Sequence, residues 1–133
     1  MASMMGAVAF QKGLGVTHSC AHALSTVCNL HHGLANGIMV PYAMQFNLEN
    51  HHEKFLRLAH AVGLTSEKPE KFVAWLKDLQ TAIGIPGQLK PVGVDRGHLS
   101  DLVSVAIKDV CHQSNPRVVT EKDFETLFLQ ALG

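Results

Sequence analysis

The sequence has no long apolar run and no excess of charge of either sign. No stretch approaches the roughly 20 consecutive apolar residues that a membrane-spanning helix requires. The 11 basic and 11 acidic residues give a formal net charge of zero, so there is neither the basic surface typical of nucleic-acid binding nor a polybasic membrane anchor. We therefore expect no nucleic-acid partner and no membrane partner.

Cysteine is scarce and unpaired in number. The three cysteines, Cys20, Cys28 and Cys111, are an odd count with no disulfide framework, which favours a reducing compartment. The N-terminus also lacks the basic start and cleavage site of a signal peptide. We expect a cytoplasmic protein in which the thiols mainly serve packing.

A two-residue alternation of apolar and polar side chains is also missing, which argues against strands. The hydrophobic fraction is 47% over 133 residues, enough for one packed domain and too high for disorder. Apolar periodicity and helix boundary signals predict an all-α fold of about seven helices. The predicted helices span residues 2–12, 17–28, 33–46, 50–61, 69–83, 98–110 and 120 onwards.

Local signals fix some of these helices more closely. Asn50 with Glu53, and Thr120 with Asp123, have the spacing of an N-cap and its reciprocal partner. The helix after Pro69 carries an apolar stripe that we expect to be buried, formed by Phe72, Leu76, Leu79 and Ile83. The first predicted helix is apolar almost all round, which is typical of a helix buried on most sides.

Histidine is abundant and clustered. Four of the nine histidines, His18, His22, His31 and His32, lie within fifteen residues. His18 and His22 are four residues apart, so a helix places both imidazoles on one face, as binding to one metal or cofactor requires. His32 can join them if the turn after Cys28 folds back. Single histidines are more often hydrogen-bonded core or surface residues, and we interpret five of the others so: His31, His51, His52, His60 and His98.

The same stretch contains a longer motif, formed by Gly13-Leu14-Gly15, His18, Ala21-His22, Leu24, His32-Gly33, Asn36 and Pro41. This motif resembles the signature of the iron-containing alcohol dehydrogenase family. The resemblance implies that His18 and His32 bind a catalytic divalent metal, Fe(II) or Zn(II). It also implies that His22 lies close to the nicotinamide of NAD or NADP and to the substrate, where it orients the substrate or moves a proton.

The sequence departs from the family pattern near the histidines and matches it again near the other end of the chain. Ser25 stands where the family usually has glycine, and Leu30-His31 replaces a frequent apolar-proline pair. Near the other end of the chain, Cys111 and Asn115-Pro116-Arg117 are similar to the family's loop that returns towards the mouth of the active site. The resemblance implies that Cys111 lines the substrate entrance.

The sequence lacks other parts that the resemblance leads one to expect. The glycine-rich dinucleotide motif is absent, and so is an aspartate followed four residues later by histidine, which supplies the family's other two metal ligands. We therefore expect residues 1–133 to be a single truncated helical domain, similar to the C-terminal helical domain of these enzymes, without the N-terminal dinucleotide-binding domain. Alone it would be inactive, although the intact enzyme would oxidise small alcohols or reduce aldehydes.

Two other classes of function stay open. A free-standing metal-binding helical protein would need a complete ligand set, and two imidazoles bind a divalent ion weakly. Alternatively, the chain is a helical remnant or interaction module whose apolar helices associate with another copy or with a separate chain. A homo-oligomer is expected in either the enzyme or the module.

Overall fold

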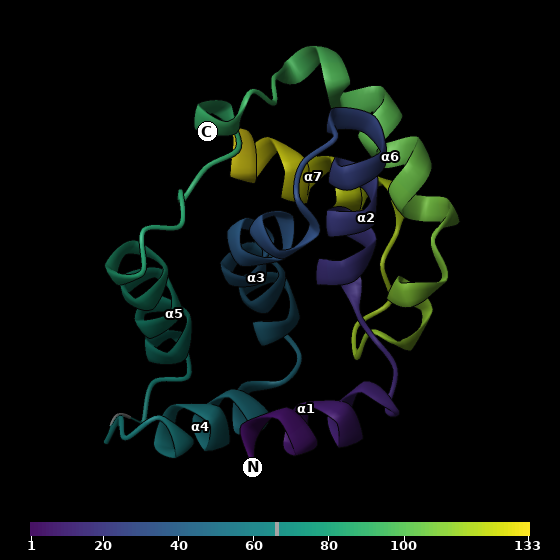
Figure 1. The fold of residues 1–133 in the computed structure, drawn as a ribbon. Helices are drawn as coiled ribbons and strands as arrows, with labels where there is room; N and C mark the ends of the chain where they lie inside the picture. Colours follow the sequence, from purple (N-terminus) through teal and green to yellow (C-terminus); the bar gives the residue numbers. More distant parts are fainter. Residues whose placement is uncertain (66) are drawn as a thin grey trace.

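The computed structural model describes residues 1–65 and 67–133, and within them the chain forms helices and no strands (Figure 1). The prediction of an all-α fold with about seven helices is confirmed. The α-helices are α1 (Ala2–Phe10), α2 (Val16–Cys28), α3 (His32–Leu48), α4 (His52–Ala61), α5 (Glu70–Ala82), α6 (Leu99–Lys108) and α7 (Glu121–Leu132). Three short 3₁₀ helices connect them: η1 (Lys90–Val92), η2 (Arg96–His98) and η3 (Val110–Ser114).

Helix α2 lies at the centre of the main core and packs against α3, α6 and η3 (Figure 1). Its buried side chains are mostly small: Val16, Cys20, Ala21, Ala23 and Leu24 are each 0% exposed. Small side chains let neighbouring backbones approach closely, and close packing holds α2 in one position. The histidine-bearing helix is therefore part of the main core.

A tight turn joins α2 to α3. Asn29 ends α2 in the left-handed conformation, with φ 52°, which asparagine tolerates better than most residues. The Leu30 amide then donates to the Leu24 carbonyl oxygen at 3.3 Å, which satisfies a carbonyl group at the end of the helix. This turn reverses the chain, so that the first residue of α3, His32, returns beside α2.

The C-terminal helix completes the main core. Thr120 and Asp123 form the predicted capping box at the start of α7. Phe124 and Phe128 are fully buried and pack in the same cluster as α2, α3 and α6. The last turn is fixed by a hydrogen bond from the Leu89 amide to the Ala131 carbonyl oxygen at 2.8 Å.

A second, smaller apolar cluster joins α4 and α5 to the end of α3. Its buried members are Leu48, Phe55, Ala59, Phe72 and Val73. The rings of Phe55 and Phe72 meet edge to face with centroids 6.0 Å apart, a favourable arrangement for aromatic pairs. This cluster is separate from the one that contains the histidine-bearing part of α2.

The predicted cap of α4 is wrong. The helix begins at His52 with His51 as its N-cap, and no side chain makes the cap hydrogen bond. The Leu48 carbonyl oxygen accepts the His51 amide at 3.1 Å, so the end of α3 already turns through residues 49–51. Asn50 is part of that turn and does not start the helix.

The predicted apolar stripe of α5 is only partly buried. Phe72 is buried, whereas Leu79 and Ile83 are 40% and 61% exposed. The face that packs on α3 instead contains Gln80, which is 7% exposed and donates through Nε2 to the Gly37 carbonyl oxygen at 2.9 Å. A polar side chain satisfied by the backbone of α3 thus sets the orientation of α5, which a purely apolar pattern does not reveal.

Helix α1 is exposed, contrary to the expectation of a helix buried on most sides. It lies alongside α4 at the end of the molecule far from α6 and α7 (Figure 1), and Met4, Met5, Val8 and Phe10 are 57–67% exposed. Among the described residues, no element packs against α1 as extensively as α3 and α6 pack against α2. Among the described helices, none is both long and apolar enough to span a bilayer.

The segment between α1 and α2 needs its glycines because it lies against the residues that follow η3. Gly13 has φ +93°, and a Cβ there would lie 2.6 Å from Ser114 Oγ. A Cβ on Gly15 would lie 2.9 Å from Asn115 Oδ1. Ser114 Oγ donates to the Leu14 carbonyl oxygen at 2.6 Å. The Gly13-Leu14-Gly15 motif thus permits two segments 100 residues apart to meet directly before the first histidine.

Candidate metal and cofactor site

The imidazoles of His18, His22 and His32 lie together. The ring centroids are 5.6 Å apart for His18 and His32, 6.0 Å for His18 and His22, and 5.2 Å for His22 and His32. The first two rings come from successive turns of α2 and the third from the start of α3. The turn at Asn29 therefore brings His32 next to His18 and His22 and completes the three-histidine cluster.

His18 and His32 have a separation that suits a shared metal ion. Imidazole nitrogens bind Zn²⁺ at about 2.1 Å, so two imidazoles on one ion place their centroids roughly 5 Å apart. Both residues also line a cleft of about 870 Å³ between α1, α3 and α4, which gives a ligand access to them. His22 is not among the residues that line this cleft.

The surroundings of His18 favour its neutral form. Burial lowers the pKa of His18, and the neighbouring His32 and His22 lower it further, while Asp109 acts weakly in the opposite direction. Neutral imidazole is the form that binds metal ions. The residue is thus prepared for ligation without the cost of removing a proton at neutral pH.

Asn36 holds the His32 side chain one turn along α3. Its Nδ2 lies 2.9 Å from His32 Nε2 and donates to the His32 carbonyl oxygen at 3.1 Å. Its Oδ1 is buried and has no partner among the described residues. Metal binding through His32 Nε2 would replace the amide hydrogen bond, and Asn36 Oδ1 offers an acceptor to a group bound beside it.

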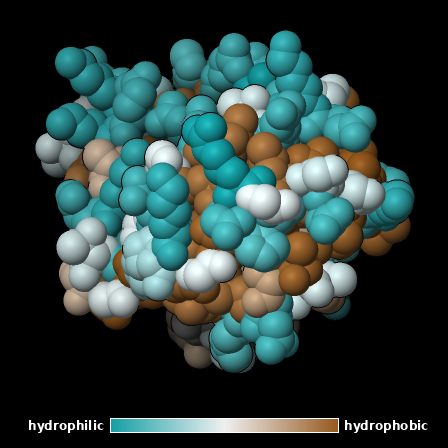
Figure 2. Space-filling view, turned by 90° about the horizontal axis from the view of Figure 1, so that it is seen from above, coloured by the Kyte–Doolittle hydropathy of each residue, from teal (hydrophilic) through white to brown (hydrophobic). Residues whose placement is uncertain are grey.

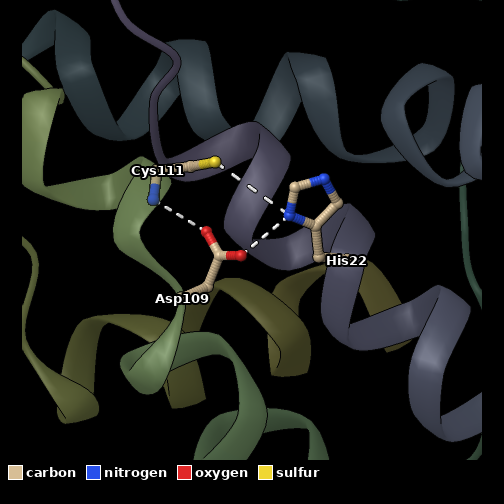
Figure 3. Close-up of side chains that lie close together, drawn as sticks. All are labelled: His22, Asp109 and Cys111. Carbon is tan, nitrogen blue, oxygen red and sulfur yellow. Dashed lines mark hydrogen bonds and ion pairs between the residues drawn. The ribbon is translucent and has the colours of Figure 1, made fainter.

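His22 is held by Asp109 (Figure 3). Asp109 Oδ2 lies 2.8 Å from His22 Nδ1, while Oδ1 accepts hydrogen bonds of 2.8 Å from Ser19 Oγ and from the Cys111 amide. Burial opposes ionisation of Asp109, but the hydrogen bonds from His22, Ser19 and Cys111 outweigh it and hold the pKa of the carboxyl well below its usual range. The ionised carboxylate fixes the orientation of the His22 ring.

Asp109 was not identified from the sequence as a partner of His22. The two residues are 87 positions apart, and Asp109 lacks the following histidine that would have marked it as one of the family's ligands. The signal that could have identified it is its position two residues before Cys111, at the start of the loop that resembles the family's active-site mouth. Carboxylates next to histidines at functional sites commonly fix the tautomer of the ring.

Cys111 lies on the same side of the cluster as Asp109. Its Sγ is 4.0 Å from His22 Nδ1, and the residue is half-buried. Burial raises the pKa of the Cys111 thiol to about 11, with a further contribution from the hydrogen bond and charge of Asp109. The free thiol is therefore a poor nucleophile at neutral pH.

Asn115 anchors the loop that carries Asp109 and Cys111. Its Oδ1 accepts from the Val16 amide and from Asn47 Nδ2, each at 3.2 Å, and its Nδ2 donates to Asn47 Oδ1 at 2.8 Å. These bonds tie the residues after η3 to the first turn of α2 and to α3. The loop is thereby fixed relative to the histidines.

The five histidines interpreted as core or surface residues lie outside the cluster of three. His31 is exposed, His52 and His60 are on α4, and His98 is paired with Asp95 at 3.1 Å. His51 lines the same cleft as His18 and His32, and its Nε2 is buried without a partner among the described residues.

Comparison with known proteins identifies the family. The family described as "Fe-containing alcohol dehydrogenase family, C-terminal" matches residues 1–132. The NAD-dependent methanol dehydrogenase of Bacillus methanolicus is 34% identical over 138 aligned residues, covering 98% of this chain and 36% of that protein. The 1,3-propanediol dehydrogenase of Klebsiella pneumoniae is 33% identical, covering 98% and 35%.

Solved structures agree with these matches. A 1,3-propanediol oxidoreductase superposes with a TM-score of 0.85 at 33% identity, covering 90% of this chain and 33% of that one. An alcohol dehydrogenase from Oenococcus oeni gives 0.83 at 31% identity, covering 89% and 32%. The chain thus spans about a third of the length of these relatives. It belongs to the iron-containing alcohol dehydrogenase family, and corresponds to the C-terminal helical domain of that family.

Proposed function

We propose that this chain contributes part of the metal, cofactor and substrate site of an NAD- or NADP-dependent alcohol dehydrogenase. The observation that carries the proposal is the convergence of His18, His22 and His32 within 5.2–6.0 Å. His18 and His32 are the metal ligands in this proposal, and the family supports Fe(II) with Zn(II) as the second candidate. A bound divalent ion would lower the pKa of a coordinated alcohol or polarise a carbonyl.

His22 is the proposed proton carrier and cofactor contact. Because its Nδ1 proton is donated to Asp109, the neutral ring has an unprotonated Nε2 that can accept a proton. Asp109 fixes this tautomer, and its own bonds to Ser19 and Cys111 fix Asp109. In the proposal, Cys111 lies at the substrate entrance and contributes shape.

We also propose that these 133 residues have no alcohol dehydrogenase activity alone. Hydride transfer requires the nicotinamide and the substrate to be held in contact, and such positioning supplies about 7–11 kcal/mol of the barrier reduction. No glycine-rich dinucleotide motif is present in the sequence. Two imidazoles also leave the charge of a divalent ion uncompensated. Each deficiency alone would abolish measurable turnover.

An interaction module is the second candidate, and the exposed apolar side chains of α1 favour it. In that case the chain would self-associate as a homo-oligomer, or bind a separate chain, without contributing to catalysis. The absence of charge excess and the three free cysteines fit a cytoplasmic protein in both cases.

The test is the NAD- or NADP-dependent oxidation of short alcohols and diols with Fe(II) or Zn(II) added. The assay compares this chain with a longer one that includes an upstream dinucleotide-binding domain. We expect turnover from the longer chain only, with loss in His18→Ala and in His32→Ala and retention in the exposed control His31→Ala. Turnover by the 133-residue chain that disappears in His32→Ala would refute the proposed inactivity. A longer chain unaffected by His18→Ala and His32→Ala would favour the interaction module.

A further inference from the structure

A second cluster of potential metal ligands lies next to the three histidines and includes only one of them. His22 Nδ1, a carboxylate oxygen of Asp109 and Cys111 Sγ all lie within 4.8 Å of one another (Figure 3). Figure 3 shows that the three side chains point toward a common space, His22 from α2 and the other two from the loop after α6. We propose that these three atoms form a site for a thiophilic divalent cation such as Zn²⁺, separate from the His18–His32 pair.

The distances require only small movements. Zn²⁺ binds imidazole nitrogen at about 2.1 Å, carboxylate oxygen at about 2.1 Å and thiolate sulfur at about 2.3 Å, so tetrahedral donors lie roughly 3.5 Å from each other. The observed separations are 2.8 Å between His22 Nδ1 and Asp109 Oδ2, and 4.0 Å between His22 Nδ1 and Cys111 Sγ. Each of the two separations differs from this spacing by less than about 1 Å.

The carboxylate is already oriented for such a role. Asp109 Oδ1 is engaged by Ser19 Oγ and by the Cys111 amide, both at 2.8 Å, which leaves Oδ2 directed at the shared space. Hydrogen bonds behind a ligand of this kind fix its direction and raise metal affinity. Solvent also has access, because the side chains of His22 and Asp109 are 39% and 18% exposed.

The charges distinguish this cluster from the His18–His32 pair. A thiolate and a carboxylate together carry two negative charges, which compensate Zn²⁺, whereas two neutral imidazoles compensate none. The mixed sulfur, nitrogen and oxygen set suits Zn²⁺ and Co²⁺ and disfavours hard cations such as Mg²⁺. We therefore expect Zn²⁺ to bind first at His22, Asp109 and Cys111 in this chain.

Binding of the cation releases a proton from the site. The cation forms a bond to Cys111 Sγ, and the thiol proton, present at neutral pH in an ordinary cysteine, is released to solvent. The cation also takes the Nδ1 lone pair of His22, so the proton now on Nδ1 moves to Nε2 of the same ring. One proton is thus released per ion. If His22 carries the proton in the proposed alcohol dehydrogenase reaction, Zn²⁺ at this site inhibits that proton transfer, because Nε2 is then protonated and cannot accept another proton. Zn²⁺ binding itself does not depend on this catalytic role of His22.

The experiment is a calorimetric titration of the reduced chain with Zn²⁺ in two buffers of different ionisation enthalpy, together with Co²⁺ absorption spectroscopy. We expect one ion per chain, one proton released, and a thiolate-to-cobalt charge-transfer band. Cys111→Ser should weaken binding more than about 100-fold and abolish the band, and Ser19→Ala should weaken it about 10- to 100-fold. Circular dichroism verifies that each variant is folded.

Two matched variants locate the ion. Cys28→Ser removes another partly buried thiol, and His18→Ala removes a ligand of the neighbouring pair; both should leave the affinity within about twofold. Asp109→Asn keeps the shape and removes the charge, and should weaken binding at least tenfold. The proposal is overturned by an absence of binding at micromolar Zn²⁺, by binding that persists in Cys111→Ser, or by binding that His18→Ala abolishes.

Discussion

Helices α1 and α2 are neighbours in the sequence and both are rich in apolar and small residues, yet their surroundings are opposite. In α2, Val16, Cys20 and Leu24 are fully buried, whereas the large side chains of α1 are exposed, Met4 at 67% and Phe10 at 63%. The difference comes from partners: α2 packs on α3, α6 and η3, and α1 has no comparable contact. An apolar composition thus predicts that a helix is buried, but the helix is buried only where other elements of the fold pack against it.

The comparison also explains why the histidine cluster is well defined. His18 and His22 project from a helix whose opposite side is locked in the core, and His32 begins a helix in the same core. Functional groups on such elements keep their geometry without a ligand. On the side seen in Figure 2, apolar residues reach the surface between hydrophilic ones, so exposure of apolar residues is not confined to α1, and single exposed ones need no explanation.

The largest predicted difference between the two helices concerns stability. Leu24→Ala leaves a cavity in the main core and should lower the free energy of unfolding by about 2–5 kcal/mol. Phe10→Ala on α1 should change it by less than about 0.5 kcal/mol. Urea unfolding followed by circular dichroism measures both. Comparable losses in the two variants would mean that α1 is packed in solution.

The second prediction concerns the carboxylate that connects α2 to the loop after α6. Asp109→Asn should destabilise the chain by about 1–3 kcal/mol at pH 7, because it disturbs hydrogen bonds to His22 and Ser19. The pKa of Asp109 is depressed in the folded state, so its contribution is complete above the ordinary carboxyl pKa of about 4 and is lost as the pH falls below it.

Unfolding measurements of both proteins between pH 7 and pH 3 check this. The difference in stability between wild type and Asp109→Asn should shrink as the pH falls below about 4. A difference that does not shrink between pH 4 and pH 3 would contradict the depressed pKa of Asp109.

The sequence predicted most of the fold because the signals involved are local. Two of these signals involve residues only three or four positions apart. They are the placement of His18 and His22 on one helix face and the capping box of Thr120 and Asp123. The family resemblance added His32 by its place in the motif. The convergence of all three rings needed the turn at Asn29, whose left-handed conformation only the structure reveals.

What the sequence could not predict depends on distant residues. Asp109 reaches His22 across 87 positions, and no local pattern marks that contact. The burial of Gln80 depends on a carbonyl oxygen of α3, so the apolar stripe of α5 gave the wrong buried face. The exposure of α1 in this chain depends in the same way on which partners the fold provides.

The third prediction concerns self-association through α1. The apolar side chains of Met4, Met5 and Phe10 are 63–67% exposed, and exposed apolar surface favours association, so the chain should associate at high concentration. Phe10→Glu should raise the dissociation constant at least tenfold, equivalent to about 1.4 kcal/mol. Gln11→Glu, with the same charge added at the neighbouring exposed position, is the control.

Light scattering over a concentration series measures this. A wild-type chain that stays monomeric throughout, or an equal response to Phe10→Glu and Gln11→Glu, would show that α1 is not the associating surface.

The imidazoles of His18 and His32 lie next to each other, close enough to bind one metal ion. The most direct test is the titration of the His18 side chain by NMR in the metal-free chain. Burial and the neighbouring charges of His32 and His22 hold the pKa of His18 below its ordinary value. We predict a depressed pKa that rises in His32→Ala and is unchanged in His31→Ala. An ordinary pKa for His18 that His32→Ala does not alter would show that the two imidazoles are apart, and would contradict the shared metal site.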